Sequence, residues 1–112
     1  MRIDTSQFNN EVYFASERDN GNMNGNATIV WPSGNKQKIT VVTSGTLTFS
    51  APDGPTNLLL KIVNGGSVGF TPSPKIKYSG GTEPTWTASG IDILSMYYDG
   101  SAYYGMVGTN FL

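Results

Sequence analysis

The 112-residue chain contains neither cysteine nor histidine. Without cysteine it has no disulfide, no thiolate nucleophile, no zinc ribbon and no iron–sulfur cluster. Without histidine it has no Ser-His-Asp triad, no histidine general base and no imidazole metal ligand within one chain. Because most common enzyme sites are thereby removed, we expect a protein that is not an enzyme and that uses no cofactor and no metal.

Charged residues are also scarce. They make up 13% of the chain, against the roughly 25% that is typical of soluble domains. Seven Lys and Arg against eight Asp and Glu give a formal net charge of -1, so no basic surface is expected for nucleic acid. No apolar run approaches the roughly 20 residues that span a bilayer, and the N-terminus lacks a secretory apolar core. We expect a soluble protein made without export, with no nucleic-acid or membrane partner.

Glycine, proline, serine, threonine and asparagine are abundant, and short β-branched or aromatic runs alternate with them from residue 27 onward. This pattern predicts strands joined by tight turns. The fold class that we expect is all-β, an antiparallel, jelly-roll-like β-sandwich of about eight short strands with an extended N-terminal arm. No internal repeat of fixed period is found. The expected strands are residues 27–31, 36–43, 46–50, 57–63, 67–71, 75–78, 91–98 and 102–107.

The first 26 residues differ in character from the rest. Residues 19–26 are an Asn/Gly-rich run that predicts a flexible or tightly turned connector. We therefore divide the chain into an arm with its connector, residues 1–26, and a β-sandwich domain, residues 27–112. The arm either docks on another protein, forms a short helix or folds back on its own sandwich. Its apolar side chains are Ile3, Phe8, Val12, Tyr13 and Phe14.

Residues 57–63 form an almost continuous apolar run, which predicts a central strand. Leu59 and Val63 face one way along such a strand, and Leu58, Leu60 and Ile62 face the other. We expect both faces to be covered.

An Asp99-Gly100 pair between two alternating runs predicts a β-hairpin with a two-residue type I′ turn. That turn would pair Tyr98 with Ser101 and Ser95 with Tyr104. Each face of the hairpin carries apolar side chains, so the second face is either a subunit interface or part of a two-sided core. The predicted faces are Leu94, Met96, Tyr98 and Tyr103 on one side and Ile93, Tyr97, Tyr104 and Met106 on the other.

Carboxylates are the only acid–base candidates. Asp53 and Asp99 precede turn glycines, where aspartate bonds the backbone. Asp92 and Glu83 would have to share a cleft to act as a glycosidase-like pair, and a strand aspartate paired with Ser, Thr or Lys is the preferred interpretation. Exposed aromatic side chains, among them Trp86, would suit a carbohydrate platform, although core or interface roles are favoured.

Four stretches of the sandwich domain together resemble a recurrent β domain of tailed-bacteriophage virion proteins, found in tail fibre ends and in small capsid-associated proteins. The resemblance covers residues 27–112. It departs from the family at residues 78–82, where Tyr-Ser-Gly-Gly-Thr stands in place of a frequent Trp-Pro-Gly-Gly-Thr. The stretches are residues 30–38, 48–61, 78–85 and 91–111.

This resemblance implies a structural role in the virion without catalysis, normally as a homotrimer. A methionine opens only a short arm before the domain, so we expect a complete chain and favour a capsid decoration or cement protein. Such a protein docks on the major capsid protein, stabilises the shell, and is assembled in the host cytoplasm. The docking contacts would be the apolar side chains of the arm, and the trimer interface would be Ile93, Tyr97, Tyr104 and Met106.

The alternative is a tail fibre or head fibre module that binds host surface polysaccharide. Its ligand would contact loops at residues 33–35 and 79–85. The candidate ligand residues are Trp86, Asn35 and Thr82.

Overall fold

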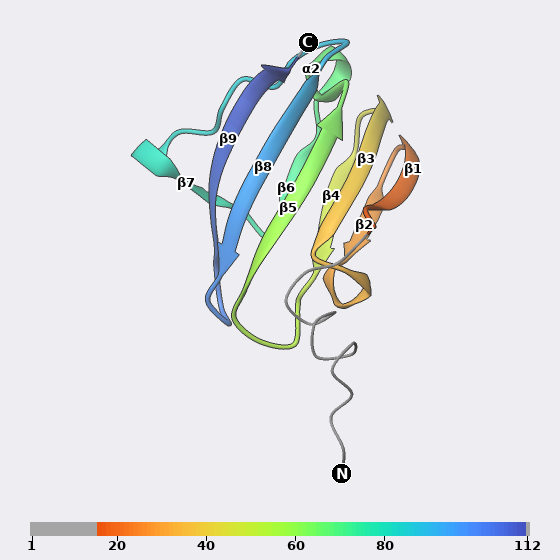
Figure 1. Ribbon diagram of the computed structural model, residues 1–112. Coiled ribbons are helices and arrows are strands. Elements are labelled where there is room, and N and C mark those ends of the chain that lie inside the picture. The colour runs from red at the N-terminus through yellow and green to blue at the C-terminus, as the bar shows by residue number, and fades with distance from the viewer. Residues whose placement is uncertain (1–15, 112) are drawn as a thin grey trace.

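The computed structural model describes residues 16–111 and consists of two packed β-sheets (Figure 1). The larger sheet has six strands in the order β1-β3-β5-β8-β9-β7, and the smaller has three in the order β2-β4-β6. The expected all-β sandwich is confirmed. The strands are β1 Arg18–Asn24, β2 Ala27–Val30, β3 Lys36–Thr43, β4 Thr46–Ser50, β5 Thr56–Val63, β6 Thr71–Ser73, β7 Lys77–Tyr78, β8 Ile91–Tyr98 and β9 Tyr103–Phe111, with one helical turn α2 Gly65–Val68 and 3-10 turns η1 Trp31–Ser33 and η2 Ser79–Gly81.

From β1 to β6 the chain alternates between the two sheets, so the strands stack as successive turns of a flattened coil. Neighbours within each sheet are therefore parallel. The separation in sequence between paired residues grows along the coil. It is 19 residues for Arg18 and Gln37 and 23 residues for Lys36 and Leu59. This uneven spacing explains why the sequence shows no repeat of fixed period.

The expected antiparallel, jelly-roll-like pairing is wrong for most of the sandwich. Among the strands of residues 16–111, only β5 with β8 and β8 with β9 are antiparallel. Between β1 and β6, each connection carries the chain across to the other sheet, whereas a hairpin would return it beside the preceding strand. At one such corner a Cβ on Gly45 would lie 2.5 Å from the carbonyl carbon of Gly25, so a side chain has no room between stacked corners.

Two local predictions are corrected. The segment expected as a connector forms β1, which pairs with β3 and buries Met23 completely, so the sandwich extends beyond the boundary placed after residue 26. Its polar residues help to hold it there, because the Asn20 Nδ2 donates to Gln37 Oε1 and to the Lys38 carbonyl, both at 3.0 Å. The strand expected at residues 67–71 is replaced by α2 and the start of β6. Asn64 turns the chain there in a left-handed conformation and donates to the Val41 carbonyl at 2.9 Å.

The core lies between the two sheets and includes an aromatic chain. The rings of Trp31 and Phe49 lie 5.6 Å apart, those of Phe49 and Tyr103 5.1 Å, and those of Tyr98 and Tyr103 4.7 Å. Burial raises the pKa of Tyr103 to about 12. Along residues 16–111, no helix has the length and apolar character that crossing a membrane requires.

The Gly66→Ala variant is expected to lower the free energy of unfolding by roughly 1–3 kcal/mol, the usual cost of overpacking. A Cβ at this position would lie 2.1 Å from the Trp86 carbonyl oxygen, and the Gly66 N–H donates to the Thr87 carbonyl at 3.1 Å. Urea unfolding followed by fluorescence measures the loss. The Gly54→Ala variant is the control, because a Cβ at Gly54 meets no atom within 4 Å, and equal midpoints for both variants would contradict the prediction.

Candidate functional site

The two faces predicted for the C-terminal hairpin are confirmed in β8 and β9. Leu94, Met96, Tyr98 and Tyr103 are all buried in the core. On the opposite face the side chains remain accessible, with exposed fractions of 47% for Tyr97, 43% for Tyr104 and 64% for Met106, while Ile93 is half-buried. The face that the sequence left open between core and interface is therefore an exposed surface of the described chain.

The hairpin register differs by two residues from the expected one. Tyr98 pairs with Tyr103 and Ser95 with Met106. The loop is longer than two residues because Asp99 Oδ1 accepts the N–H groups of Ser101 at 2.8 Å and Ala102 at 2.7 Å. The backbone hydrogen bonds from Ala102 and Ser101, together with a side-chain hydrogen bond from Tyr104, lower the pKa of Asp99. A shift of two residues preserves the side-chain alternation, which is why the faces were still assigned correctly.

The exposed face continues onto the central strand β5. Leu59 is 41% exposed and pairs with Ser95, which in turn pairs with Met106, so a row crosses three strands. The expectation that both faces of β5 are covered holds only for its inner residues Leu58, Leu60 and Ile62, which are buried. We call the following five residues the outer patch: Leu59, Ile93, Tyr97, Tyr104 and Met106.

The outer patch is shallow and has a cationic rim. Two hollows of about 430 and 380 Å³ lie beside it, and Gly105 and Met106 line both of them. Lys77 Nζ lies 5.8 Å from the centre of the Tyr104 ring, within the distance at which a cation is attracted to an aromatic face. The surface is therefore apolar and aromatic, and it is bounded by Lys77 on the β7 side.

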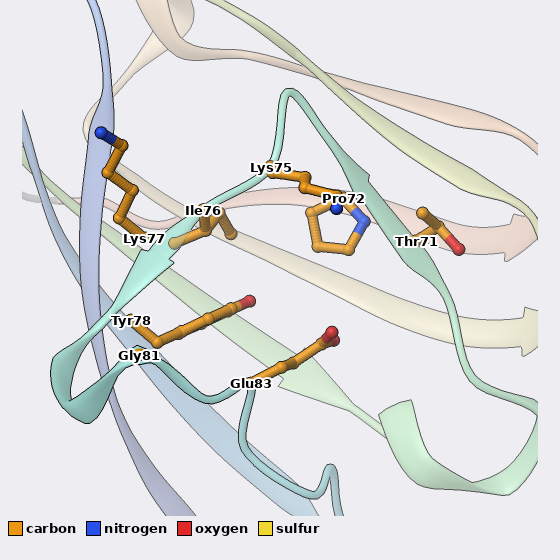
Figure 2. A pocket seen from close by; sticks show the side chains of 8 residues that line it. All are labelled: Thr71, Pro72, Lys75, Ile76, Lys77, Tyr78, Gly81 and Glu83. Carbon is orange, nitrogen blue, oxygen red and sulfur yellow. The ribbon is translucent and has the colours of Figure 1, made fainter.

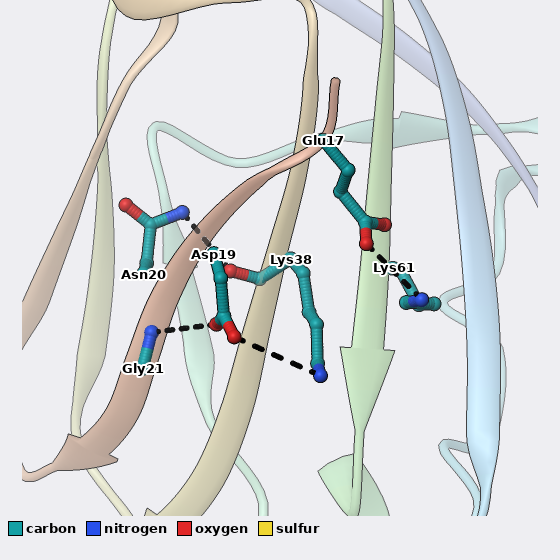
Figure 3. Close-up of polar contacts among 6 residues, drawn as sticks. All are labelled: Glu17, Asp19, Asn20, Gly21, Lys38 and Lys61. Atoms are coloured by element: carbon teal, nitrogen blue, oxygen red, sulfur yellow. Dashed lines mark hydrogen bonds and ion pairs between the residues drawn. The ribbon is translucent and has the colours of Figure 1, made fainter. Parts of the chain in front are cut away.

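The other half of the same face is largely polar and carries two ion pairs (Figure 3). Glu17, just before β1, reaches across β3 to Lys61 on β5 at 3.2 Å, and Asp19 pairs with Lys38 at 3.8 Å. Exposed pairs of this kind contribute little stability. The outward-facing apolar side chains of this face gather on β5, β8 and β9, and Val42 on β3 is exposed apart from them.

The three candidate ligand residues have different surroundings, and their ligand role stays a prediction. Asn35 lies before β3, where its carbonyl accepts the Leu59 N–H at 2.8 Å. Thr82 lines a hollow beside Met106, between β7 and β8 in the chain. Trp86 is part of a packed cluster, with its ring 5.0 Å from Phe70.

The candidate carboxylates have separate structural partners. Asp92 is wholly buried and accepts the Thr87 N–H and the Thr87 hydroxyl, both at 2.7 Å, and the Asn110 N–H at 2.9 Å. The expectation of a Ser, Thr or Lys partner is confirmed, and a buried Asp92 does not face a cleft with Glu83. Within residues 16–111, no group of three potential ligands could hold a metal ion. The apolar arm residues Ile3, Phe8, Val12, Tyr13 and Phe14 lie outside the described residues, so their docking role stays a prediction.

Comparisons with family models, with curated proteins and with solved structures find no match. Function is therefore inferred from the residues of this chain.

Sequence reasoning missed a groove of about 540 Å³ between the β6–β7 segment and the loop after η2 (Figure 2). Glu83 stands in this groove, with Oε2 accepting the Trp86 indole N–H at 3.0 Å. The Tyr78 hydroxyl is buried and has no hydrogen-bond partner in the described part of the chain, an arrangement that costs about 1–3 kcal/mol. Burial, with a further effect from Glu83, raises the pKa of Tyr78. The described chain thus offers an apolar patch suited to protein association and a groove with polar groups.

Proposed function

We propose that this chain is a structural protein of a bacteriophage virion. In this proposal it is a small homotrimeric capsid decoration, or cement, protein that docks on the shell of major capsid protein and stabilises it. The resemblance of residues 27–112 to a virion β domain supports the virion role. The absence of cysteine and histidine from the whole chain is compatible with a role that needs no catalysis.

The outer patch is the observation that carries the proposal. Contiguous exposed apolar surface is uncommon on soluble monomers and marks association sites. Tyrosine and methionine are enriched in such interfaces, and Tyr97, Tyr104 and Met106 are the most exposed members of the patch. In the proposed trimer this patch contacts neighbouring copies, which leaves the arm, residues 1–15, to contact the capsid.

The copy number and position of the chain in purified particles test this proposal. Quantitative gel densitometry combined with particle imaging is expected to find many copies on the capsid shell. Finding no copy in the particle would overturn a virion role altogether.

A deletion of residues 1–15 then tests the arm. The cut stops before Glu17 because that residue pairs with Lys61. The shortened chain is expected to keep its fold and lose its binding to shells that lack the protein, whereas unchanged binding would exclude the arm as the docking element.

The second candidate function is a tail fibre or head fibre module that contacts host surface polysaccharide. The groove between β6 and β7 favours it, because a recessed site with polar groups suits a small polar ligand better than a flat protein surface. A few copies confined to the tail or the fibres would support this function and contradict the decoration role.

A further inference from the structure

The groove beside β7 has two walls of different chemistry (Figure 2). Pro72 and Lys75 come from one side, and the side chains of Tyr78 and Glu83 extend toward it from the other. Lys77 points away from this space, toward the β9 ribbon. Pro72, Ile76 and the Tyr78 ring supply an apolar surface beside the polar groups.

The polar groups of the groove are mixed in kind. Glu83 is an acceptor, Lys75 is a donor, and the hydroxyls of Thr71 and Tyr78 can both donate and accept. Glu83 would attract a cation and repel an anion, and Lys75 would do the opposite. The groove therefore favours neither an anionic nor a cationic ligand. A hydroxyl group satisfies either kind of partner, because it donates one hydrogen bond and accepts others.

Two features show that the polar groups are positioned. The Trp86 indole N–H holds one oxygen of Glu83 at 3.0 Å, which leaves the other oxygen without a hydrogen bond among the described residues. The Tyr78 hydroxyl, although buried, also has no partner there. Buried polar groups are nearly always paired, so an orphan hydroxyl on the wall of a groove points to a ligand that completes it.

We propose that this groove binds an uncharged ring that carries several hydroxyl groups, which is the chemistry of a neutral saccharide. Ring hydroxyls donate to Glu83 and accept from Lys75, and the Tyr78 hydroxyl gains its missing partner. The C–H face of the ring lies against Pro72 and the Tyr78 ring. Trp86 acts as a positioning residue that orients Glu83, so the sugar does not stack on it. The inference rests on the groove of the second candidate function and names its ligand class, and it can fail while the decoration role stands, or the reverse.

The two tryptophans make the test specific. Trp86 contacts the groove through Glu83, whereas Trp31 is buried in the core, so the full-length ¹⁵N-labelled protein has one reporting indole signal and one internal reference. Methyl glycosides of glucose, galactose, mannose and N-acetylglucosamine are titrated, with glucuronate and glucosamine as charged counterparts. At least one neutral glycoside is expected to shift the Trp86 signal in a saturable manner and to leave Trp31 unmoved.

Three variants distinguish binding from structure. Glu83→Gln keeps an oxygen for Trp86 but loses the charge, and it is expected to weaken binding about ten-fold. Tyr78→Phe removes only the hydroxyl and is expected to weaken binding about five-fold. Glu17→Gln, which removes a half-exposed carboxylate outside the groove, should leave affinity unchanged.

The proposal is overturned by any of three results. These are no saturable Trp86 shift with any neutral glycoside, saturation by the charged sugars alone, or affinities that Glu83→Gln and Tyr78→Phe leave unchanged.

Discussion

Replacement of Asp92 by alanine is expected to lower the free energy of unfolding by about 3–5 kcal/mol, the range found when one partner of a buried polar network is removed. The carboxylate is wholly buried and accepts three hydrogen bonds. Its removal leaves the Thr87 N–H, the Thr87 hydroxyl and the Asn110 N–H without their acceptor. Each unpaired buried donor keeps its desolvation cost, and the cavity left by the side chain adds to it.

Urea unfolding of the wild type and of Asp92→Ala measures this loss. The Asp92→Asn variant keeps the volume and one carbonyl oxygen but turns an N–H₂ group toward existing donors, so we expect an intermediate loss of roughly 2 kcal/mol. Asp53→Asn is the matched control in an exposed turn and should stay within about 0.5 kcal/mol of the wild type. Similar midpoints for Asp92→Ala and Asp53→Asn would show that the network contributes nothing.

Asp92 also links the core to the groove. It lies on β8 and holds Thr87, the residue after Trp86, as well as Asn110 on β9. Trp86 in turn donates a hydrogen bond to Glu83. The Glu83 side chain, which we assign to sugar binding, is therefore anchored indirectly by the buried Asp92 carboxylate. Loss of Asp92 is therefore expected to disturb the Trp86 indole signal as well as global stability.

The sequence predicted the faces of β5, β8 and β9 because side-chain alternation depends only on strand geometry. It did not predict the hairpin register, because the Asp99 side chain replaces a tight turn by its own hydrogen bonds to Ser101 and Ala102. Asp-Gly permits both loops, so the dipeptide alone does not specify the register.

Local sequence patterns could not predict that strands β1 to β6 stack in parallel. A short polar turn that carries the chain to the opposite sheet has the same composition as one that closes a hairpin. The corner at Gly45, where the backbone of Gly25 lies too close for a side chain, is visible only once the two turns are stacked. In the same way, β1 was predicted to be a connector because it is rich in Asn and Gly, and its attachment to β3 through the Asn20 side-chain amide is not visible in that composition.

The groove was missed for a related reason. Tyr78, Glu83 and Trp86 lie within nine residues of one another, but their spacing matches no familiar motif. The brief parallel pairing of β7 with β9 places Tyr78 beside Gly105, and a hydrogen bond from the Trp86 indole holds Glu83. Trp86 was considered for an exposed carbohydrate platform, with a core or interface role favoured, and the structure packs its ring on Phe70.

The Tyr97→Ser/Met106→Ser double variant is expected to convert a trimer into a monomer. Both side chains belong to the outer patch and are at least 47% exposed, so their loss should leave the fold intact. If they are buried between copies, losing two apolar contacts weakens association by about 3 kcal/mol, or about 100-fold. Light scattering at micromolar concentration is expected to show the mass of three chains for the wild type and of one for the variant.

A matched control separates the patch from general surface hydrophobicity. Val42 is 45% exposed on β3, and lies about 20 Å along the strand direction from the level of Leu59. Val42→Ser is therefore expected to keep the mass of three chains, with an unchanged circular dichroism spectrum in both variants. A wild type that is monomeric at this concentration would remove the trimer from the proposed function, whereas dissociation by Val42→Ser as well would show that the interface extends over the polar half of the sheet, where Glu17 and Lys61 would then face a neighbouring copy.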